Sequence, residues 1–208
     1  MKMIINEMPK LESPFVREKN EKGDYVVTNK IAEGYEWVFE DKETKAIEKL
    51  HGENVSIYID TIGNITHIWS RGRRVPFFTV DNRTIIDGLL NSYKRGYMEF
   101  LPEGQHFGEL IGPGMQGNAY KINEPLWIPF NTYAKKNLYY KSWGKYPKTF
   151  ESISEWFKTL MPLYAGHIGS ESKFVEGVVF THPDGRMAKL RKDMFDWYKG
   201  ERHKKNER

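Results

Sequence analysis

The sequence predicts an α+β fold in which antiparallel sheets are flanked by helices. Apolar and polar residues alternate in 55–60 and 65–69, and a Gly-Asn turn joins these two segments. A Pro-Asp-Gly turn joins a second pair of short apolar segments, 174–180 and 186–191. Both patterns are typical of β-hairpins. Two longer segments, around 84–97 and 149–163, repeat apolar residues at helical spacing and predict amphipathic helices.

Composition limits the classes of protein that the chain can represent. Its 208 residues suit one medium-sized domain with a hydrophobic core. Its 32 lysines and arginines exceed its 28 aspartates and glutamates, a mild basic excess that is compatible with a phosphate-rich partner. Without cysteine, neither disulfides nor thiolate metal sites can form. No apolar stretch suits a membrane span, and no signal-peptide layout is present, so we expect a soluble cytoplasmic protein.

The other predicted elements follow along the chain. Two short strands are expected at 25–28 and 36–40, before the first hairpin. A strand at 107–112 breaks at a Gly-Pro-Gly run, and an aromatic strand follows at 126–131. Residues 131–148 interleave tyrosines with lysines, a composition that suits single-stranded nucleic acid and a mixed surface loop equally well.

The run Lys49-Leu50-His51-Gly52 places one lysine just ahead of the first hairpin. Because glycine carries no side chain, another backbone or a bulky polyanion can approach the amine closely. This arrangement suits a lysine nucleophile. A solvated lysine in a turn is the plain alternative, because a match of four residues is weak by itself.

Five short elements share the order of the motifs of one enzyme family. They are Lys49–Gly52, Ser70–Arg73, Phe107–Gly112, Glu176–Val179 and Ala188–Arg191. Together they resemble the motifs of ATP-dependent RNA ligases, in the phage RNA-ligase-2-like branch of the covalent nucleotidyltransferase superfamily. In that superfamily the lysine of a Lys-x-(Asp/His/Asn)-Gly element becomes covalently attached to AMP. His at the third position is found mostly in RNA ligases, whereas DNA ligases usually carry Asp.

The resemblance implies a nucleotidyltransferase domain with ATP in the crevice between its sheets. It implies an enzyme that joins RNA 3′-hydroxyl and 5′-phosphate ends through a lysyl-AMP intermediate and an adenylylated RNA 5′ end, in RNA repair. We expect residues 1–208 to form a single minimal domain with its motifs between 48 and 192, a C-terminal helix and basic tail at 193–208, and no OB-fold domain. We also expect a monomer, with no membrane partner, in a bacterial or phage-infected host cell.

The resemblance assigns the phosphate chemistry to four residues. Lys49 is the expected nucleophile, and Lys189 and Arg191 are expected on the phosphates. Residues two apart in a strand project from one face, and two cations on one face repel each other unless an anion joins them. The triphosphate is that anion. Glu176 is expected to hold Mg²⁺ or Mn²⁺, because a carboxylate is a hard oxygen donor. Nearby cations should favour the neutral amine that attacks phosphorus.

The remaining assignments concern the nucleoside. Arg71 is expected near the ribose and phosphates, and Glu109 on the ribose hydroxyls, with a solvated edge-strand glutamate as the alternative. Phe130 is expected to stack on adenine, with Trp127 as its reserve. The complete set implied for nucleotide binding is Glu48, Lys49, His51, Gly52, Asn54, Arg71, Glu109, Phe130, Glu176, Lys189 and Arg191.

Two other functions fit the same motifs. A DNA-strand ligase or an RNA cap guanylyltransferase would use a similar lysine, and ATP, GTP and NAD tested side by side separate these classes. A noncatalytic RNA-binding module with an inherited nucleotide pocket is the alternative from another class. The complete set of Lys49, Glu109, Glu176 and Lys189 argues against it.

Overall fold

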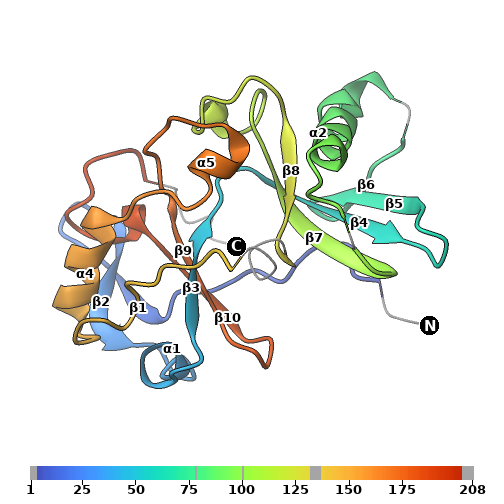
Figure 1. The fold of residues 1–208 in the computed structure, drawn as a ribbon. Coiled ribbons are helices and arrows are strands. Elements are labelled where there is room, and N and C mark those ends of the chain that lie inside the picture. The colour runs from blue at the N-terminus through green and yellow to red at the C-terminus, as the bar shows by residue number, and fades with distance from the viewer. Residues whose placement is uncertain (1–3, 78, 100, 132–136, 203–208) are drawn as a thin grey trace. The chain divides into compact units, whose positions relative to one another are not determined.

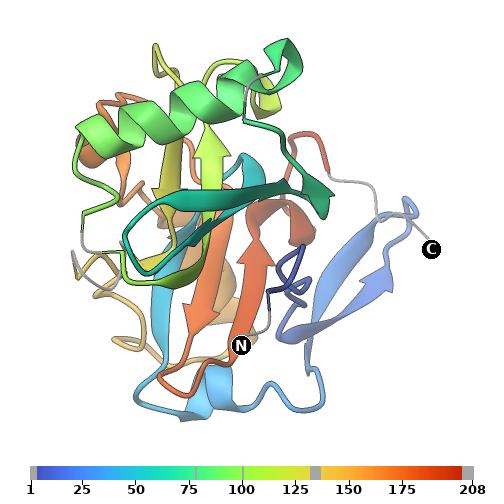
Figure 2. The same ribbon diagram turned by 90° about the vertical axis from the view of Figure 1, so that its right-hand side faces the viewer.

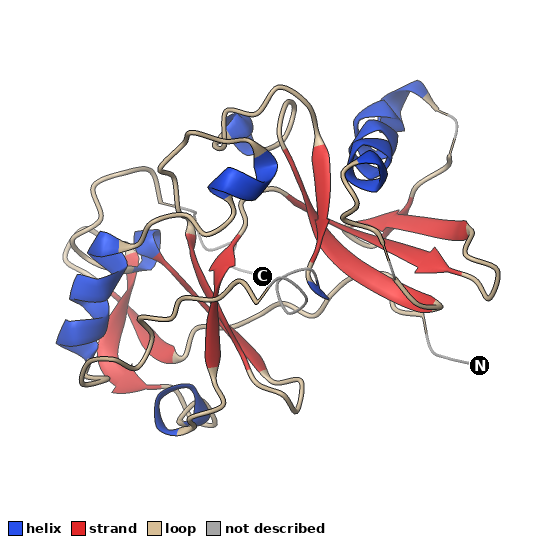
Figure 3. Cartoon of the chain, in the orientation of Figure 1, coloured by secondary structure: helices blue, strands red, loops and turns tan. Residues whose placement is uncertain are grey.

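The structure is a computed structural model that describes residues 4–77, 79–99, 101–131 and 137–202. It confirms the α+β class with antiparallel sheets (Figure 3). The chain divides into two compact units. Unit 1 comprises Met1–Lys10, Leu50–Leu138 and Tyr164–Phe174, and unit 2 comprises Leu11–Lys49, Tyr139–Leu163 and Val175–Arg208. None of the helices in the described ranges has the length and apolar character that a membrane span requires.

Unit 1 contains a five-stranded antiparallel sheet with strand order β6-β5-β4-β7-β8 (Figure 1). Its strands are β4 (Glu53–Ile59), β5 (Ile65–Ser70), β6 (Arg73–Arg74), β7 (Gly104–Ile111) and β8 (Leu126–Pro129). The first predicted hairpin is confirmed as β4 and β5, in which Ile57 pairs with Ile68. The predicted strands at 107–112 and 126–131 are β7 and β8, which pair with each other.

Helix α2 (Arg83–Lys94) packs on β8 and β7 in unit 1, as Figure 2 shows. Its residues Ile85 and Leu89 join a core with Val55 and Leu110. Among its described residues, this unit also contains the short helical turns η1 (Val80–Asn82), η2 (Gln116–Asn118) and α5 (Ala165–Ile168). The helix predicted near 84–97 is therefore confirmed, but it ends three residues earlier, and Gly96 follows with a φ of 72° that favours glycine.

Unit 2 contains a three-stranded sheet and a separate hairpin. The sheet has the order β10-β9-β3, and the hairpin consists of β1 and β2. The strands are β1 (Phe15–Lys19), β2 (Tyr25–Ile31), β3 (Lys45–Lys49), β9 (Gly177–Thr181) and β10 (Met187–Arg191). The second predicted hairpin is thus confirmed as β9 and β10, in which Val178 pairs with Leu190.

An aromatic core holds unit 2 together. Helix α4 (Phe150–Thr159) contributes Trp156 and Phe157, which lie in one cluster with Phe180 and Phe195. The Thr149 side chain caps this helix by accepting a hydrogen bond from the Ser152 N–H, 3.3 Å away. The helix ends at Thr159, shortly before Pro162, near which the sequence predicts its end, and its C-cap Leu160 is no longer helical (ψ 128°).

The strand predicted at 36–40 is wrong, because these residues form the helical turn α1 (Trp37–Glu40). Trp37, Val38 and Phe39 are consecutive, and all three are buried in the core of unit 2. A strand would have pointed alternate side chains to opposite faces. The helical turn lets one core accept all three side chains.

The helix expected from Asp193 is also absent from the described residues. Only η3 (Lys192–Met194) is helical there, and Phe195–Arg202 forms turns and extended chain. The Arg202 guanidinium donates hydrogen bonds to the carbonyls of Asp193, Phe195, Asp196 and Tyr198. Carbonyls that a helix would use are therefore bonded to one side chain. Residues 203–208 of the expected basic tail lie outside the described range.

Candidate active site

The register of the sheet in unit 2 places three predicted catalytic residues on one face. Lys49 of β3 pairs with Gly177 of β9, and Gly177 pairs with Arg191 of β10. In the next row, Lys189 is paired with Val179 of β9. Directly opposed residues and residues two apart in a strand point to the same face of a sheet. Lys49, Lys189 and Arg191 therefore share a face.

Glycine is required at the centre of this arrangement. A Cβ atom at Gly177 would lie 2.3 Å from the carbonyl oxygen of Leu190. No side chain fits at that distance, so Gly177 permits the close approach of β9 and β10. The glycine of the Glu176-Gly177 pair is thus needed for the packing of the sheet, whatever the chemical role of Glu176.

Lys49 forms an ion pair with Glu176, the expected metal ligand. Its Nζ lies 2.6 Å from Glu176 Oε2, and the side chains are only 21% and 7% exposed. Glu176 directly precedes β9, and its carbonyl accepts a hydrogen bond from the Lys192 N–H. A carboxylate this close stabilises the ammonium form of an amine. Lys49 and a metal ion would therefore compete for the same carboxylate.

Arg191 is held in place by an acid that the sequence interpretation had not singled out. Its Nε lies 2.9 Å from Asp193 Oδ1, and both side chains are about nine-tenths buried. Burial, followed by the positive charge of Arg191, lowers the pKa of Arg17. The ion pair with Asp193 therefore fixes the orientation of the Arg191 guanidinium. The sequence signalled Asp193 as a partner only by its position, two residues after Arg191, which is predicted to bind phosphate.

Glu48 lies on the other face of β3, away from Lys49. It is opposed to buried Val178, is only 1% exposed, and its Oε2 accepts a hydrogen bond from the Leu163 N–H, 2.5 Å away. Burial lowers the pKa of the nearby Lys192, and the charge of Glu48 partly offsets this effect. The structure therefore gives Glu48 a role inside unit 2 and does not bring its carboxylate to the face that carries Lys49.

In unit 1, Glu109 contacts the backbone of the lysine motif. Its Oε1 accepts a hydrogen bond from the Gly52 N–H at 3.0 Å. The residue lies opposite Asn54 in β4 and Ile128 in β8, so β7 is paired on both sides. The edge-strand alternative for Glu109 is therefore wrong. Asn54 and Glu109 are paired and lie on the same sheet face, an arrangement that is compatible with binding one nucleotide.

His51 is supported by two aromatic residues that the sequence interpretation missed. Its N–H donates to the Tyr120 hydroxyl at 2.8 Å, and its ring centroid lies 5.4 Å from that of Phe174. The rings of Tyr120 and Phe174 also meet edge to face. Tyr120 lies two residues after the Gln-Gly-Asn run that follows the third element, and Phe174 lies two residues before the fourth, so motif proximity was the only available signal.

The structure separates the two candidates for adenine stacking. Trp127 is fully buried, and its Nε1 donates to the Val55 carbonyl, so this residue belongs to the core of unit 1. Phe130 is only partly buried, directly after β8, and its N–H donates to the Phe107 carbonyl at 2.9 Å. Arg71 is exposed and adopts a φ of 45° next to Gly72. Phe130 and Arg71 therefore keep accessible side chains.

Three side chains of the tyrosine-rich connection, Tyr140, Tyr146 and Lys148, have structural roles in unit 2. Tyr140 and Tyr146 pack against the core of unit 2, and burial raises the pKa of both phenols. Lys148 donates to the Phe39 carbonyl at 2.8 Å. These groups are already used inside unit 2, so they do not form a stacking surface for RNA bases. Tyr133, Lys135 and Lys136 of this connection lie outside the described residues.

Three potential metal ligands lie together at the opposite end of β3 and β9 from Lys49. They are Asp41, Glu43 and His182. Nε2 of His182 lies 3.0 Å from Asp41, and Nδ1 lies 2.9 Å from Asp184. The histidine thus already links the turn before β3 to the turn after β9. This cluster does not include Glu176, the residue expected to bind the metal.

Comparisons with known proteins support the fold. No protein-family model and no curated protein matches the sequence. Among solved structures, a Naegleria gruberi RNA ligase mutant with ATP and Mn matches with a TM-score of 0.50 and 17% identity, over 89% of this chain and 62% of that chain. The same ligase with PPi matches with a TM-score of 0.46 and 19% identity, over 93% and 59% of the two chains. The chain thus spans about three fifths of the length of these ligase chains, and the first match shows a similar fold.

Proposed function

We propose that this protein is an ATP-dependent RNA ligase. The observation that carries the proposal is the shared sheet face of Lys49, Lys189 and Arg191, with Glu176 ion-paired to the lysine. An amine, two phosphate-binding cations and a metal-binding carboxylate are the groups that nucleotidyl transfer to a lysine requires. The fold likeness to an RNA ligase supports the same reaction.

The reaction begins on Lys49. Its amine attacks the α-phosphorus of ATP, the bond to the pyrophosphate oxygen breaks, and lysyl-AMP forms with release of pyrophosphate. The AMP then passes to the 5′-phosphate of an RNA strand, and a 3′-hydroxyl displaces AMP to form the phosphodiester. Lys189 and Arg191 neutralise the phosphates during the first displacement.

Because Lys49 is ion-paired to Glu176, its amine must separate from this carboxylate before it can attack ATP. Mg²⁺ or Mn²⁺ supplies positive charge that neutralises phosphate oxygens, and Glu176 is the residue that would hold it. One solved ligase structure that matches this chain contains ATP and Mn. A cation held by the Glu176 carboxylate would offset its negative charge and so would weaken its ion pair with Lys49.

We assign the nucleoside to residues of unit 1. Glu109 accepts ribose hydroxyls, Phe130 stacks on adenine, and Arg71 contacts the ribose and phosphates. The backbone around His51 and Gly52 is fixed by Tyr120 and Glu109 and supports these contacts. Asn54 shares the face of Glu109, and Glu48 contributes from within unit 2 by fixing β3.

Finer features of the proposal rest on the motif resemblance. His51 in the third position of the lysine element favours an RNA ligase over a DNA ligase, and the five motifs together resemble the phage RNA-ligase-2-like branch, to which we propose that the chain belongs. We propose RNA repair as the process, RNA 3′-hydroxyl and 5′-phosphate ends as the partners, and a monomer acting as a single minimal nucleotidyltransferase domain.

A joining assay tests this function. Labelled 5′-phosphorylated RNA is incubated with ATP and Mg²⁺, and matched RNA, DNA and hybrid strands are compared. We expect RNA joining that Lys49→Ala abolishes and Lys45→Ala retains, because Lys45 lies on the same β3 face but pairs with Thr181 at the far end. A preference for DNA ends would favour a DNA ligase, and use of GTP would favour a guanylyltransferase.

A further inference from the structure

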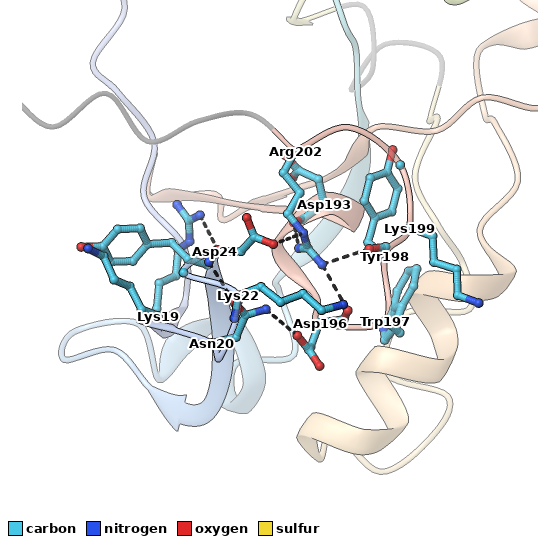
Figure 4. A pocket seen from close by; sticks show the side chains of 14 residues that line it. Lys19, Asn20, Lys22, Asp24, Asp193, Asp196, Trp197, Tyr198, Lys199 and Arg202 are labelled. Carbon is cyan, nitrogen blue, oxygen red and sulfur yellow. Dashed lines mark hydrogen bonds and ion pairs between the residues drawn. The ribbon is translucent and has the colours of Figure 1, made fainter.

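A groove of about 900 Å³ lies in unit 2, apart from the residues assigned to ATP. It is formed by the turn that joins β1 to β2 and by the chain that follows η3, as Figure 4 shows. Its volume falls within the range of small-molecule and cofactor sites, about 300–1,000 Å³. The groove is therefore large enough to receive a segment of a partner.

The acids that line this groove are already engaged. Asp24 forms an ion pair with Arg202 at 3.3 Å, and Asp193 forms one with Arg191. Asp196 accepts a hydrogen bond from the Asn20 side chain at 2.8 Å. The charges of Asp24 and Asp193 are thus compensated by arginines, whereas Asp196 is hydrogen-bonded to a neutral amide. A ligand in the groove would meet mainly the basic groups.

Two basic groups in the groove are exposed and available. Lys22 and Lys199 are exposed, and within the described residues their amines make no hydrogen bond or ion pair. They project from opposite walls, one from the β1–β2 turn and one from the segment after η3. Exposed amines without a partner are available to pair with an anion that lies along the groove.

Two aromatic rings also line the groove, beside cations other than Lys22 and Lys199. The Lys19 amine lies 5.4 Å from the centroid of the Tyr25 ring, and the Arg202 guanidinium lies 6.0 Å from that of Tyr198. Cations for phosphates beside rings for bases are the combination used to bind single-stranded nucleic acid. An acidic peptide would use the amines but has no need of the rings.

The groove also adjoins the predicted phosphate-binding strand. Asp193 lines the groove and at the same time holds Arg191, which shares the sheet face of Lys49. We propose that this groove binds the sugar–phosphate backbone of an RNA strand that is to be joined. The inference deepens the proposed ligase function and rests on it.

The test uses charge reversal at the two free amines. A Lys22→Glu, Lys199→Glu double variant is compared with wild type and with Lys42→Glu, which changes an exposed lysine of unit 2 outside the groove. Binding of labelled single-stranded RNA is measured by fluorescence anisotropy at several salt concentrations. Formation of the AMP adduct from ATP is measured in parallel, without RNA.

We expect the double variant to bind RNA at least about tenfold more weakly at low salt. Its slope of log K against log salt should be smaller in magnitude by about 1.4, since each phosphate contact with a single strand contributes about 0.7. AMP-adduct formation should remain at the wild-type rate. The Lys22→Arg, Lys199→Arg variant should bind RNA like wild type, because it keeps both charges.

Three results would overturn the proposal. The first is that the double variant binds RNA as tightly as wild type, and the second is that Lys42→Glu loses as much RNA affinity as the double variant. The third is that the double variant loses affinity for poly-glutamate, measured in the same assay, as much as for RNA, which would indicate an unspecific anion site. Failure of the wild-type protein to form an AMP adduct would contradict the ligase function instead. The anisotropy measurement does not depend on that reaction, so the two failures are distinguishable.

Discussion

Replacing Gly52 by alanine should damage both the stability of unit 1 and the lysine motif. A Cβ atom at this position would lie 2.0 Å from the carbonyl oxygen of Leu110, whereas real Cβ contacts are essentially never below 3.0 Å. The strand backbone must therefore move by about 1 Å, and overpacking of this kind costs about 1–3 kcal/mol. The shift also strains the hydrogen bond from the Gly52 N–H to Glu109, a charge-assisted bond worth about 1.5–3 kcal/mol.

We expect a total loss of about 3 kcal/mol for Gly52→Ala, which lowers the melting temperature of a chain this long by roughly 6–12 °C. Circular dichroism melting gives the stability, and ATP-dependent adduct formation gives the activity. Gly166→Ala is the matched control, because nothing lies within 4 Å of its Cβ position and its φ is not positive. Wild-type melting and adduct formation by Gly52→Ala would refute the close approach.

Three further predictions concern charged groups. Glu176→Gln removes the carboxylate paired with Lys49. It should lower the unfolding free energy by about 2 kcal/mol, between the values for exposed and buried ion pairs, and it should abolish metal-dependent adduct formation. Unchanged adduct formation would contradict the metal role of Glu176. Lys189→Ala should slow adduct formation from ATP more than sealing of RNA already adenylylated at its 5′ end, since only the first reaction has a pyrophosphate leaving group; equal slowing would indicate general positioning or RNA contact. The Arg186 backbone N–H, aided by His182, lowers the pKa of Asp184 from 3.8 to about 2, so its stabilisation is present above pH 3.8 and is lost as pH falls through about 2. Urea unfolding should therefore show a deficit for Asp184→Asn at pH 6 that shrinks towards pH 2, and a deficit independent of pH would contradict this.

Features set by local alternation could be predicted from the sequence. Residues two apart in a strand share a face, so Lys189 and Arg191 could be placed together without knowing the rest of the sheet. Both hairpins were also recognisable, since their turns contain residues that favour tight reversal. The pairing of Lys49 with Gly177 could not be inferred in this way. It depends on which strands meet across more than 120 residues of sequence, and local patterns do not specify that choice.

Features set by tertiary packing were missed or misread. The 36–40 segment has strand-like composition, but the aromatic core of unit 2 needs three consecutive side chains, and a helical turn supplies them. Asp193 beside Arg191 and Tyr120 beside His51 are contacts between side chains or loops, which no periodicity reports. The neighbours of Glu109 likewise depend on strand order in the sheet.

The location of AMP on the protein tests the ligase chemistry most directly. Purified protein is incubated with ATP and Mg²⁺ and then analysed by intact mass and peptide mapping. We expect a gain of one AMP, carried by Lys49, which is absent from Lys49→Ala and from reactions without metal. No covalent adduct under these conditions, or an adduct on another residue that Lys49→Ala retains, would contradict it.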